Sequence, residues 1–467
     1  MKRCWRFAVV LPFVIVSVAT PVAAPQDGTA APDQPRWLEQ YREPASRLIN
    51  EAMSDKFAWR RLSVLTDTIG HRLSGSPQLD RAIEWAVEQM KRDGLENVHT
   101  EPVMVPKWVR GNESAEIVEP GRYPLVMLGL GGSVATPPNG IRAEVLVVRS
   151  FSDLDARARQ ARGRIVLFNV PFTNYVEAGR YRISGASRAA RYGAVAMLVR
   201  SIGPDGLRLP HTGALQYTPG TPDIPAAAIA SEDADQLQRM SDRGDSVVVR
   251  LKMDAHFEGE APSANVVGEL RGRERPDEVV VVGGHLDSWD VGAGASDDGG
   301  GCIVTWEALR IMKKLGLRPR RTVRVVLWTN EENGGRGGLA YRDQHKAELA
   351  QHVLMLESDL GVFRPVGFGF SGNDRGKQRV RAIATLLRGI GADTISSSGD
   401  GGDISPSVHD ANIPAMSLEV ETSRYFQIHH TPADTVDKID PVEMARCAAA
   451  VTVIAYVAAE LPERLGD

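Results

Sequence analysis

Two adjacent carboxylates at the end of an apolar segment are the first sign of chemistry in this sequence. Glu331 and Glu332 follow residues 322–329, an apolar run long enough for a buried strand, and four glycines stand among the next six residues. Burying an unpaired carboxylate is costly, so a positive charge must compensate at least one of them. The pair could then divide the work, with one acid holding a cation and its neighbour transferring protons.

Further potential metal ligands stand after other apolar runs. They are His285 after 279–284, Asp297 in the next glycine-rich loop, Asp359 after 353–358, and His430 after 415–420. A single residue of this kind usually caps a helix or closes a turn. Several converging on one side indicate a metal site, and imidazole with carboxylate suits zinc, with manganese or cobalt as alternatives.

The elements that must position these residues form an alternating pattern. After about residue 263, the apolar runs alternate with segments predicted to be helices, at 299–314, 337–346, 377–388 and 442–460. Continuous apolar strands are typical of a mostly parallel sheet with helices on both faces, an α/β fold. Ligands bind outside the carboxyl ends of the strands in such sheets, where the candidate residues stand.

The rest of the chain is predicted to begin this fold and then interrupt it. Residues 25–106 contain an amphipathic helix, opened by Ser76 and Pro77 and closed by Gly94, and are assigned to the N-terminal part of the catalytic domain. Residues 107–260 change to short β-type runs between proline and glycine turns, so we expect an inserted β-rich domain there. Residues 261–467 are the expected main part of the catalytic domain.

The motifs taken in order resemble a known enzyme family. "HLDS", "SDDGGG", "NEE", "ESD" and "HHTPADT" together are similar to the co-catalytic two-zinc aminopeptidase and carboxypeptidase family. The resemblance covers the chain from about residue 263 onward and residues 62–98, while 107–260 weakly resemble the protease-associated insert of these enzymes. It implies the zinc-peptidase phosphorylase/hydrolase-like fold, two Zn²⁺ per chain (or Mn²⁺ or Co²⁺), a small peptide substrate and a homodimer.

The resemblance also implies a set of five metal ligands. Asp297 would bridge two metals, with one histidine and one carboxylate completing each: His285 and Asp359 on one, His430 and Glu332 on the other. Three carboxylates and a bridging hydroxide would neutralise two divalent cations. Metal coordination lowers the pKa of a bound water to near 7, which makes hydrolysis practicable at neutral pH.

Residues around the expected ligands receive supporting roles. Glu331 would stay off the metals and act as the general base. Asp287 would orient the imidazole of His285 through its carboxylate. Tyr425 would either stabilise the oxyanion or pack as an aromatic residue, and His429 would be a spare imidazole that shapes the site.

The choice of His430 over His429 as a ligand follows the family pattern, in which the histidine precedes a Thr or Ser and then an acid three residues further on. Thr431 and Asp434 match that pattern. Asp400, Asp403 and His409 lie in another glycine-rich loop, where a turn with capped polar groups is favoured over a substrate pocket.

Composition limits the class of protein. The chain has 467 residues, 24% charged residues and a formal net charge of −4, so no basic field indicates a nucleic-acid partner. No G-x-S-x-G motif is present, which argues against a serine hydrolase of that type. After removal of the signal sequence two cysteines remain, Cys302 and Cys447, and their apolar helical contexts favour buried thiols over a disulfide.

The N-terminus resembles a cleavable secretory signal. Basic residues precede an apolar stretch at 7–18, and small residues follow up to Ala24, the expected cleavage site. The apolar stretch is shorter than the roughly 20 residues that span a bilayer. Residues 1–24 are therefore predicted to be a signal peptide, and the mature protein to be secreted or periplasmic without a membrane anchor.

The predicted function is an exported di-zinc metallo-exopeptidase that hydrolyses dipeptides or small peptides. A general aminopeptidase is the alternative within enzymes, because the sequence does not indicate which end of the peptide is held. A single-zinc cyclase of the same fold is a third possibility. A non-catalytic ectodomain on the same fold is disfavoured, since all five expected ligands and Glu331 are present.

Overall fold

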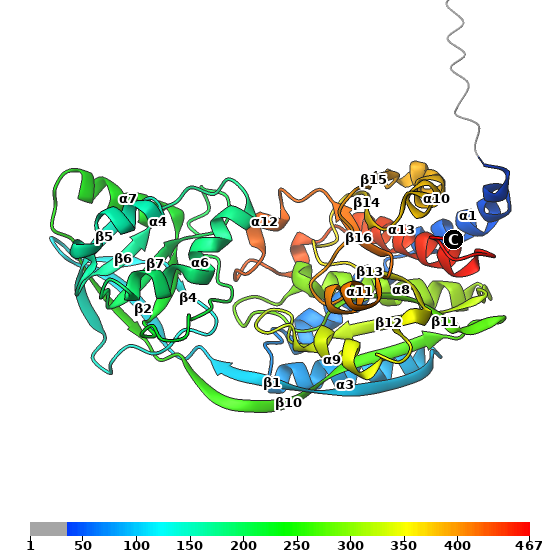
Figure 1. Ribbon diagram of the computed structural model, residues 1–467, viewed down its shortest axis with the longest axis horizontal. Coiled ribbons are helices and arrows are strands. Elements are labelled where there is room, and N and C mark those ends of the chain that lie inside the picture. Colours follow the sequence, from blue (N-terminus) through cyan, green and yellow to red (C-terminus); the bar gives the residue numbers. More distant parts are fainter. Residues whose placement is uncertain (1–34) are drawn as a thin grey trace, which may run out of the picture.

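The computed structural model describes residues 35–467, and the predicted signal peptide at 1–24 lies outside them. Two eight-stranded sheets occupy opposite ends of an elongated molecule (Figure 1). The first sheet holds the predicted metal ligands. The second is formed largely by the segment expected to be an insert.

The first sheet has a parallel centre and antiparallel edges. Strands β12, β11, β13 and β16 run parallel to one another in the middle, whereas β10 and β14 pair antiparallel with their outer members. The strands, in their order across the sheet, are β1 (Glu96–Val109), β10 (His256–Leu270), β12 (Arg321–Trp328), β11 (Arg275–His285), β13 (His352–Glu357), β16 (Ala415–Val420), β14 (Pro365–Ser371) and β15 (Thr394–Ser396).

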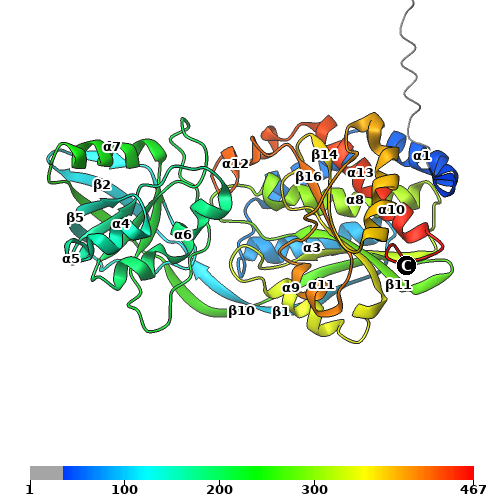
Figure 2. The same ribbon diagram turned by 45° about the horizontal axis from the view of Figure 1, so that its top comes forward.

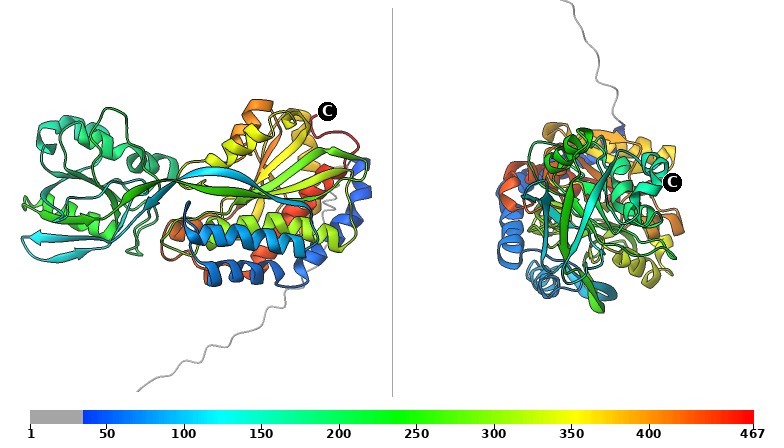
Figure 3. Two further views of the ribbon diagram at one scale, coloured as in Figure 1. Left: turned by 90° about the horizontal axis from the view of Figure 1, so that it is seen from below. Right: turned by 90° about the vertical axis from the view of Figure 1, so that its left-hand side faces the viewer.

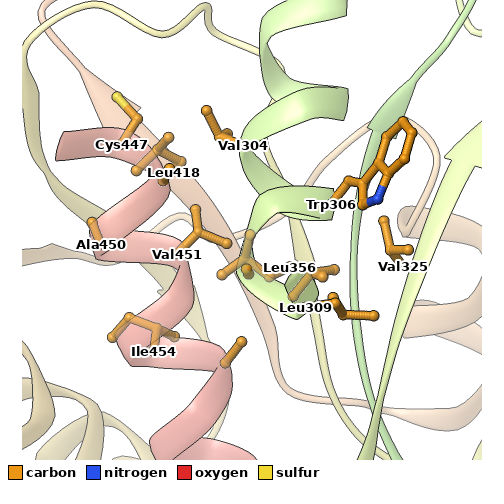
Figure 4. Close-up of a cluster of buried hydrophobic side chains, with 14 of the residues drawn as sticks. Val304, Trp306, Leu309, Val325, Leu356, Leu418, Cys447, Ala450, Val451 and Ile454 are labelled. Atoms are coloured by element: carbon orange, nitrogen blue, oxygen red, sulfur yellow. The ribbon is translucent and has the colours of Figure 1, made fainter. Parts of the chain in front are cut away.

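Helices cover both faces of this sheet, as its apolar strands require. All residues of β12 and β13 are buried. On one face α8 and α13 pack against the sheet. Trp306 of α8 points toward Val325 of β12, and Val451 and Ile454 of α13 belong to the same buried cluster (Figure 4). On the other face Tyr341 of α9 and Val408 of α11 join a smaller apolar cluster. Fixed between two layers, the strands present their carboxyl ends as a rigid edge.

The helices of this half agree with the sequence pattern to within a few residues. Each predicted helix after residue 263 has an observed counterpart, and short turns of helix fill several loops. They are η3 (Ala295–Gly299), α8 (Gly300–Lys314), α9 (Arg336–Gln344), η4 (Leu349–Gln351), α10 (Asp374–Ala384), η5 (Thr385–Ile390), α11 (Ser405–Ala411), α12 (Tyr425–Ile428), η6 (Val436–Lys438) and α13 (Pro441–Glu460).

The N-terminal helices lie on the same half. The predicted helix after Ser76 is confirmed, since the Ser76 hydroxyl accepts a hydrogen bond from the backbone N–H of Leu79 at the start of α3. The elements before β1 are η1 (Arg36–Tyr41), α1 (Arg42–Met53), α2 (Phe57–Val64), η2 (Leu65–Ile69) and α3 (Pro77–Arg92).

The second sheet also carries helices, so the segment expected to be β-rich is a mixture of strands and helices. Its strand order is β3 (Tyr123–Leu125), β2 (Glu113–Glu119), β9 (Val248–Met253), β5 (Ile141–Val148), β6 (Ile165–Phe168), β7 (Ala196–Arg200), β8 (Ala226–Ile229) and β4 (Met127–Gly129). Its helices are α4 (Phe151–Ala156), α5 (Ala158–Ala161), α6 (Tyr175–Ala190) and α7 (Ser231–Asp242). Its two apolar clusters contain residues of this segment alone.

Two long strands join the halves. β1 and β10 pair antiparallel from Glu96 opposite Glu269 to Val109 opposite His256, and form a ribbon that leads from the first sheet to the second (Figure 3). The sequence boundaries expected at 107 and 260 fall inside these two strands. The ribbon is continuous in secondary structure, so the change in composition there does not mark a flexible linker.

Two other predictions concern the core. Cys302 and Cys447 are free and buried, which confirms the thiol interpretation. Among the described residues, α13 is the one helix long and apolar enough to cross a membrane, and 83% of its most apolar window is buried inside the protein. It is therefore the central helix of the core, consistent with its contacts to α8.

Candidate metal centre

Five predicted ligands meet at the carboxyl ends of the parallel strands. They form two groups of three that share Asp297: His285, Asp297 and Asp359 in one, and Asp297, Glu332 and His430 in the other. In each group, one potential ligand atom per residue lies within 4.8 Å of the others. His429 belongs to neither group among the described residues.

Asp297 stands between two imidazoles. Its Oδ1 lies 3.2 Å from Nε2 of His285, and its Oδ2 lies 3.1 Å from Nε2 of His430. The outer carboxylates approach the same two nitrogens, Asp359 at 3.2 Å from His285 and Glu332 at 3.0 Å from His430. Each imidazole therefore faces two carboxylates through its Nε2, an arrangement that can enclose one cation on either side of Asp297.

The donor set fits zinc on chemical and electrostatic grounds. Oδ2 of Asp297 and Oε1 of Glu332 are buried and make no hydrogen bond within the protein. Burial, and then repulsion from Asp297, raises the pKa of Glu332 to about 7. Carboxylates gathered in this way are unfavourable without a cation. Histidine nitrogen and carboxylate oxygen are ligands that zinc takes in proteins.

The backbone around Asp297 is fixed by two other buried acids. Asp434 accepts hydrogen bonds from the backbone N–H groups of Ser296 and Asp297, at 2.7 and 3.1 Å. Asp298 accepts hydrogen bonds from the backbone N–H groups of His285 at 3.1 Å and of Gly301 at 3.0 Å, so it acts as a capping residue at the start of α8. The sequence shows Asp434 only as part of the family motif around His430. Its hydrogen bonds to the backbone of Ser296 and Asp297 explain why an acid stands there.

Asp287 has a role different from the one predicted. Nδ1 of His285 donates to the backbone carbonyl of Asp287 at 3.0 Å, whereas the Asp287 carboxylate is 3.8 Å from that nitrogen. The carboxylate instead accepts from the backbone N–H groups of Glu331 and Glu332, at 3.1 and 3.3 Å. Asp287 thus orients the two neighbouring glutamates rather than the imidazole, because the short spacing to His285 favours the local carbonyl.

Arg72, which the sequence analysis did not predict, supports the loop between His285 and Asp297. Its fully buried guanidinium donates to four backbone carbonyls, those of Gly70, Leu286, Ala293 and Gly294, at 2.6 to 3.0 Å. Those carbonyls include both ends of the loop between His285 and Asp297. The only sequence signal was its place in the segment 62–98, which the family resemblance covers.

The second half of the molecule reaches the metal centre. Nδ1 of His430 donates to the carbonyl of Thr212 at 3.2 Å, and the backbone N–H of Thr212 donates to the carbonyl of His430 at 3.0 Å. His430 has a φ of 59°, a conformation that non-glycine residues rarely adopt and that such paired contacts help to maintain. With Nδ1 engaged, Nε2 is the nitrogen left for a metal.

His429 and Tyr425 shape the wall beside the ligands. Their rings stack with centroids 4.9 Å apart, and both nitrogens of His429 are buried without a hydrogen bond. Burial, and then repulsion from His430, lowers the pKa of His429 well below its usual range. His429 is therefore a neutral packing residue, while Tyr425 also lines the cavity next to the metal centre.

Glu331 points toward a different part of the site from Glu332. It is half-buried and lines the cavity. Its Oε1 lies close to Gly402, where a Cβ on any other residue would come within 2.7 Å of that oxygen. Burial, and then repulsion from Asp359, raises the pKa of Glu331 well above its usual range. A carboxyl group with a raised pKa that faces a substrate-sized cavity is suited to proton transfer.

The glycine-rich loop that contains Asp400, Asp403 and His409 is partly exposed and partly buried. Asp400 and His409 are exposed and lie 3.4 Å apart, as expected for a turn. Asp403 is buried, and its backbone donates to the carboxylate of Glu357. Burial, and then repulsion from Glu357 and Glu331, raises the pKa of Asp403 well above its usual range. Asp403 therefore contributes to the polar surroundings of Glu331, which the sequence did not indicate.

A cavity of about 330 Å³ opens onto the metal centre. It is lined by residues from both halves, including Tyr175 and Arg182 of α6, Tyr425 of α12, Glu331 and Asp359. Figure 2 shows α12 next to α6 at the junction, where the rings of Tyr175 and Phe426 lie 5.6 Å apart. The volume is at the small end for ligand sites, which suits a small substrate.

Comparisons with known proteins agree with this geometry. Residues 265–455 match the sequence profile of peptidase family M28. The chain is 47% identical to carboxypeptidase Q of Bos taurus over 431 residues, which cover 92% of this chain and 91% of that protein. It is 45% identical to carboxypeptidase Q of Homo sapiens, with 90% of each chain covered.

Solved structures show the same fold. The crystal structure of a peptidase M28 precursor from Shewanella amazonensis matches with a TM-score of 0.88 and 35% identity, covering 92% of this chain and 98% of that one. A zinc aminopeptidase from Bacillus subtilis matches with a TM-score of 0.65 and 20% identity, over 88% and 97% of the two chains. Within the two-zinc family, the motif order is most like carboxypeptidase Q, also called plasma glutamate carboxypeptidase, and the identities support that likeness.

Proposed function

Because this chain belongs to peptidase family M28 and is a zinc metallo-exopeptidase, we propose that its substrates are dipeptides and other small peptides. The observation that carries the proposal is the pair of ligand groups sharing Asp297 at the base of a cavity of about 330 Å³. The match to carboxypeptidase Q over nine-tenths of the chain favours the same conclusion.

We propose two zinc ions per chain, one in each ligand group. Asp297 would contact both, and its two oxygens already face different histidines. When bound, zinc would lower the pKa of a coordinated water and polarise the scissile carbonyl. The remaining chemistry falls to side chains that lie beside the ligands.

Glu331 is the proposed general base. Asp287 holds the backbone of both glutamates, so Glu332 can face the metal while Glu331 faces the cavity. Glu331 would accept a proton from the attacking water and return it to the leaving amine, a role that needs a pKa nearer neutrality than that of a free carboxyl group. Its raised pKa is consistent with this role.

Tyr425 is the proposed donor to the oxyanion. It lines the cavity with Asp359 and Glu331, and its stacking on His429 fixes its ring. A phenol held at that place can donate a hydrogen bond to an oxygen that gains negative charge. His429 would act only by packing.

The cellular setting belongs to the same proposal. Residues 1–24 would be removed on export, leaving a secreted or periplasmic enzyme without a membrane anchor, and residues 107–260 would form a protease-associated-type insert. The Shewanella relative is described as a precursor, which favours export. A homodimer is expected from the family resemblance.

Metal content and peptide hydrolysis test the proposal together. The mature chain is purified, its zinc is quantified by mass spectrometry, and free amino acids released from a dipeptide panel are measured. Two zincs with dipeptide cleavage would support it. Rapid cleavage of longer peptides from the amino end would favour a general aminopeptidase, and one zinc with cyclised products would favour a cyclase. Two zincs without cleavage of any peptide would contradict it and favour a non-catalytic ectodomain.

A further inference from the structure

Asp290 and Arg110 form an ion pair across the junction between the two halves of the molecule. Asp290 lies in the loop between His285 and Asp297, and Arg110 directly follows β1, where the ribbon reaches the second half (Figure 3). Nε of Arg110 lies 2.9 Å from Oδ2 of Asp290, and its Nη2 lies 2.6 Å from Oδ1. Both side chains are largely buried. Two parallel hydrogen bonds give such a pair a fixed geometry.

The rest of the Arg110 guanidinium is bound within the second half. Its Nη1 donates to the carbonyl of Gly129, the last residue of β4, and its Nη2 donates to the hydroxyl of Thr212 at 3.4 Å. The Thr212 hydroxyl donates to the same Gly129 carbonyl at 2.7 Å. Arg110 therefore joins Asp290 to the segment that contains Thr212.

Thr212 in turn holds the metal ligand His430. Its carbonyl accepts a hydrogen bond from Nδ1 of His430, and its backbone N–H donates to the His430 carbonyl. The contacts thus form a series that leaves the first half at Asp290, passes through Arg110 and Thr212, and returns to the first half at His430. A change at Asp290 can reach His430 through this series without altering another metal ligand.

The residue next to Asp290 packs the same junction closely. Trp289 is 2% exposed, and a Cβ at Gly131 of the second half would lie 1.8 Å from its ring, so only glycine leaves room for the indole. Trp289 meets Trp108 edge-on, with ring centroids 6.4 Å apart, and its ring lies 5.9 Å from that of His430. The ion pair therefore belongs to a fitted interface between the halves.

The two ligand groups differ in their dependence on this interface. His285 ends β11 and Asp359 stands just after β13, so strands of the first sheet place both residues. His430 stands in a loop after α12, has a φ of 59°, and is held by Thr212 of the second half. A shift of the second half would therefore displace His430 first.

We propose that the Arg110–Asp290 pair is a positioning device for His430. This inference rests on the proposed two zinc ions and assigns them different dependences on the second half. The zinc held by Glu332 and His430 requires the pair, because Thr212 is fixed through Arg110. The zinc held by His285 and Asp359 does not.

The variant Asp290→Asn tests the inference with little change in side-chain size. Glu113 lies 3.7 Å from Arg110 and still compensates its charge, so the variant mainly removes the paired hydrogen bonds. Zinc is titrated into the metal-free protein in competition with a chelator. One of the two zincs should bind about 10- to 100-fold more weakly, as expected for groups that orient a metal ligand, while the other keeps its affinity. Equal weakening of both zincs, or of neither, would overturn the inference.

Two further variants test the geometry of the pair and the selectivity of the measurement. Arg110→Lys keeps the charge but not the planar pair of donors, so it should weaken the same zinc by less than Asp290→Asn does. Glu119→Gln is the matched control, because it breaks an exposed ion pair with Arg142 in the same half. It should leave both zinc affinities unchanged.

The variant His430→Ala identifies which zinc is affected. Alone, it should retain one tightly bound zinc, the one held by His285 and Asp359. Adding Asp290→Asn should not weaken that zinc further, since both substitutions act on the same ligand group. A further loss of zinc in the double variant would overturn the inference.

Hydrogen exchange of the metal-free protein separates this inference from the proposed function. Asp290→Asn should speed exchange of the Thr212 backbone N–H by about tenfold, as expected for the loss of a hydrogen bond to a charged group. Exchange at Leu167 in β6 should not change. Faster exchange at Thr212 would support the positioning contact even if the unmodified chain bound no zinc. Unchanged exchange would overturn it even if the enzyme were an active di-zinc peptidase.

Discussion

His430 and Thr212 exchange two hydrogen bonds across the junction between the two halves of the molecule. The imidazole Nδ1 donates to the Thr212 carbonyl, and the Thr212 N–H donates to the His430 carbonyl. The two residues are separated by 218 positions in sequence. The segment after β7 therefore holds one expected metal ligand, and the second sheet takes part in building the centre as well as in covering it.

Thr212→Val should weaken this connection without removing the backbone contacts. The Thr212 hydroxyl donates to the Gly129 carbonyl at 2.7 Å, and valine cannot replace that bond. We expect zinc affinity to fall by up to about tenfold, at the low end for residues that orient a ligand. Chelator competition measures the change. Thr218→Val in the same loop is the control, and equal affinities in both variants would contradict the role of Thr212.

Glu331→Gln should separate metal binding from proton transfer. Glutamine keeps the size of the side chain but cannot accept a proton, so turnover should fall by roughly 10²- to 10⁴-fold. The zinc content should equal that of the unmodified enzyme, since Glu331 belongs to neither ligand group. Steady-state kinetics with mass spectrometry of the metal check both points. Full activity would rule out the assigned role.

Asp287→Ala should reduce metal affinity although Asp287 is not an expected ligand. The variant removes the acceptors that hold the backbone N–H groups of Glu331 and Glu332. Removal of such supporting groups typically lowers metal affinity by about 10- to 100-fold. Asp277→Ala is the control, because Asp277 is exposed on β11, the strand that precedes Asp287. Unchanged zinc affinity in Asp287→Ala would show that the glutamates hold their positions alone.

Metal removal should give the protein a new dependence of stability on pH. Without a cation, the folded-state pKa of Glu332 is about 7, above the 4.5 of a free glutamate. Between these values the folded protein holds a proton that the unfolded chain has released, so this contribution to stability is complete below pH 4.5 and is lost as the pH rises through 7.

The comparison of metal-free and zinc-loaded protein isolates this effect. The free energy of unfolding of both forms is measured by chemical denaturation at pH 5 and pH 8. The zinc-loaded form should exceed the metal-free form by more at pH 8, because zinc supplies the positive charge that the ionised acids lack. In the metal-free form, the variant Glu332→Gln should narrow the difference in the free energy of unfolding between pH 5 and pH 8. If the stability difference between the two forms did not change with pH, the ionised acids of the centre would not destabilise the metal-free protein.

Local sequence patterns were sufficient to predict most of the metal ligands. His285 is the last residue of β11, and Glu332 and Asp359 stand in the loops just after β12 and β13, so strand geometry alone brings them together. The role of Thr212 depends on contacts between distant segments and had no sequence pattern of its own. Asp287 was misassigned because the choice between its carboxylate and its carbonyl depends on where the glutamate backbone lies.

Arg72→Lys should destabilise both the fold and the bridging carboxylate. The Arg72 guanidinium satisfies four buried carbonyls at once, and a lysine ammonium has three donors on a point charge with a different reach. At least one carbonyl would be left without a partner, which costs about 1–3 kcal/mol. Two of these carbonyls, at Ala293 and Gly294, immediately precede the turn that carries Asp297.

The loss should therefore appear in two measurements on the same variant. The free energy of unfolding should fall by about 1–3 kcal/mol, and zinc affinity should fall with it because the loop before Asp297 loses its anchor. Arg81→Lys on the exposed side of α3 is the control and should change neither quantity. A variant that lost stability but kept full zinc affinity would show that Asp434 alone suffices to hold the backbone of Asp297.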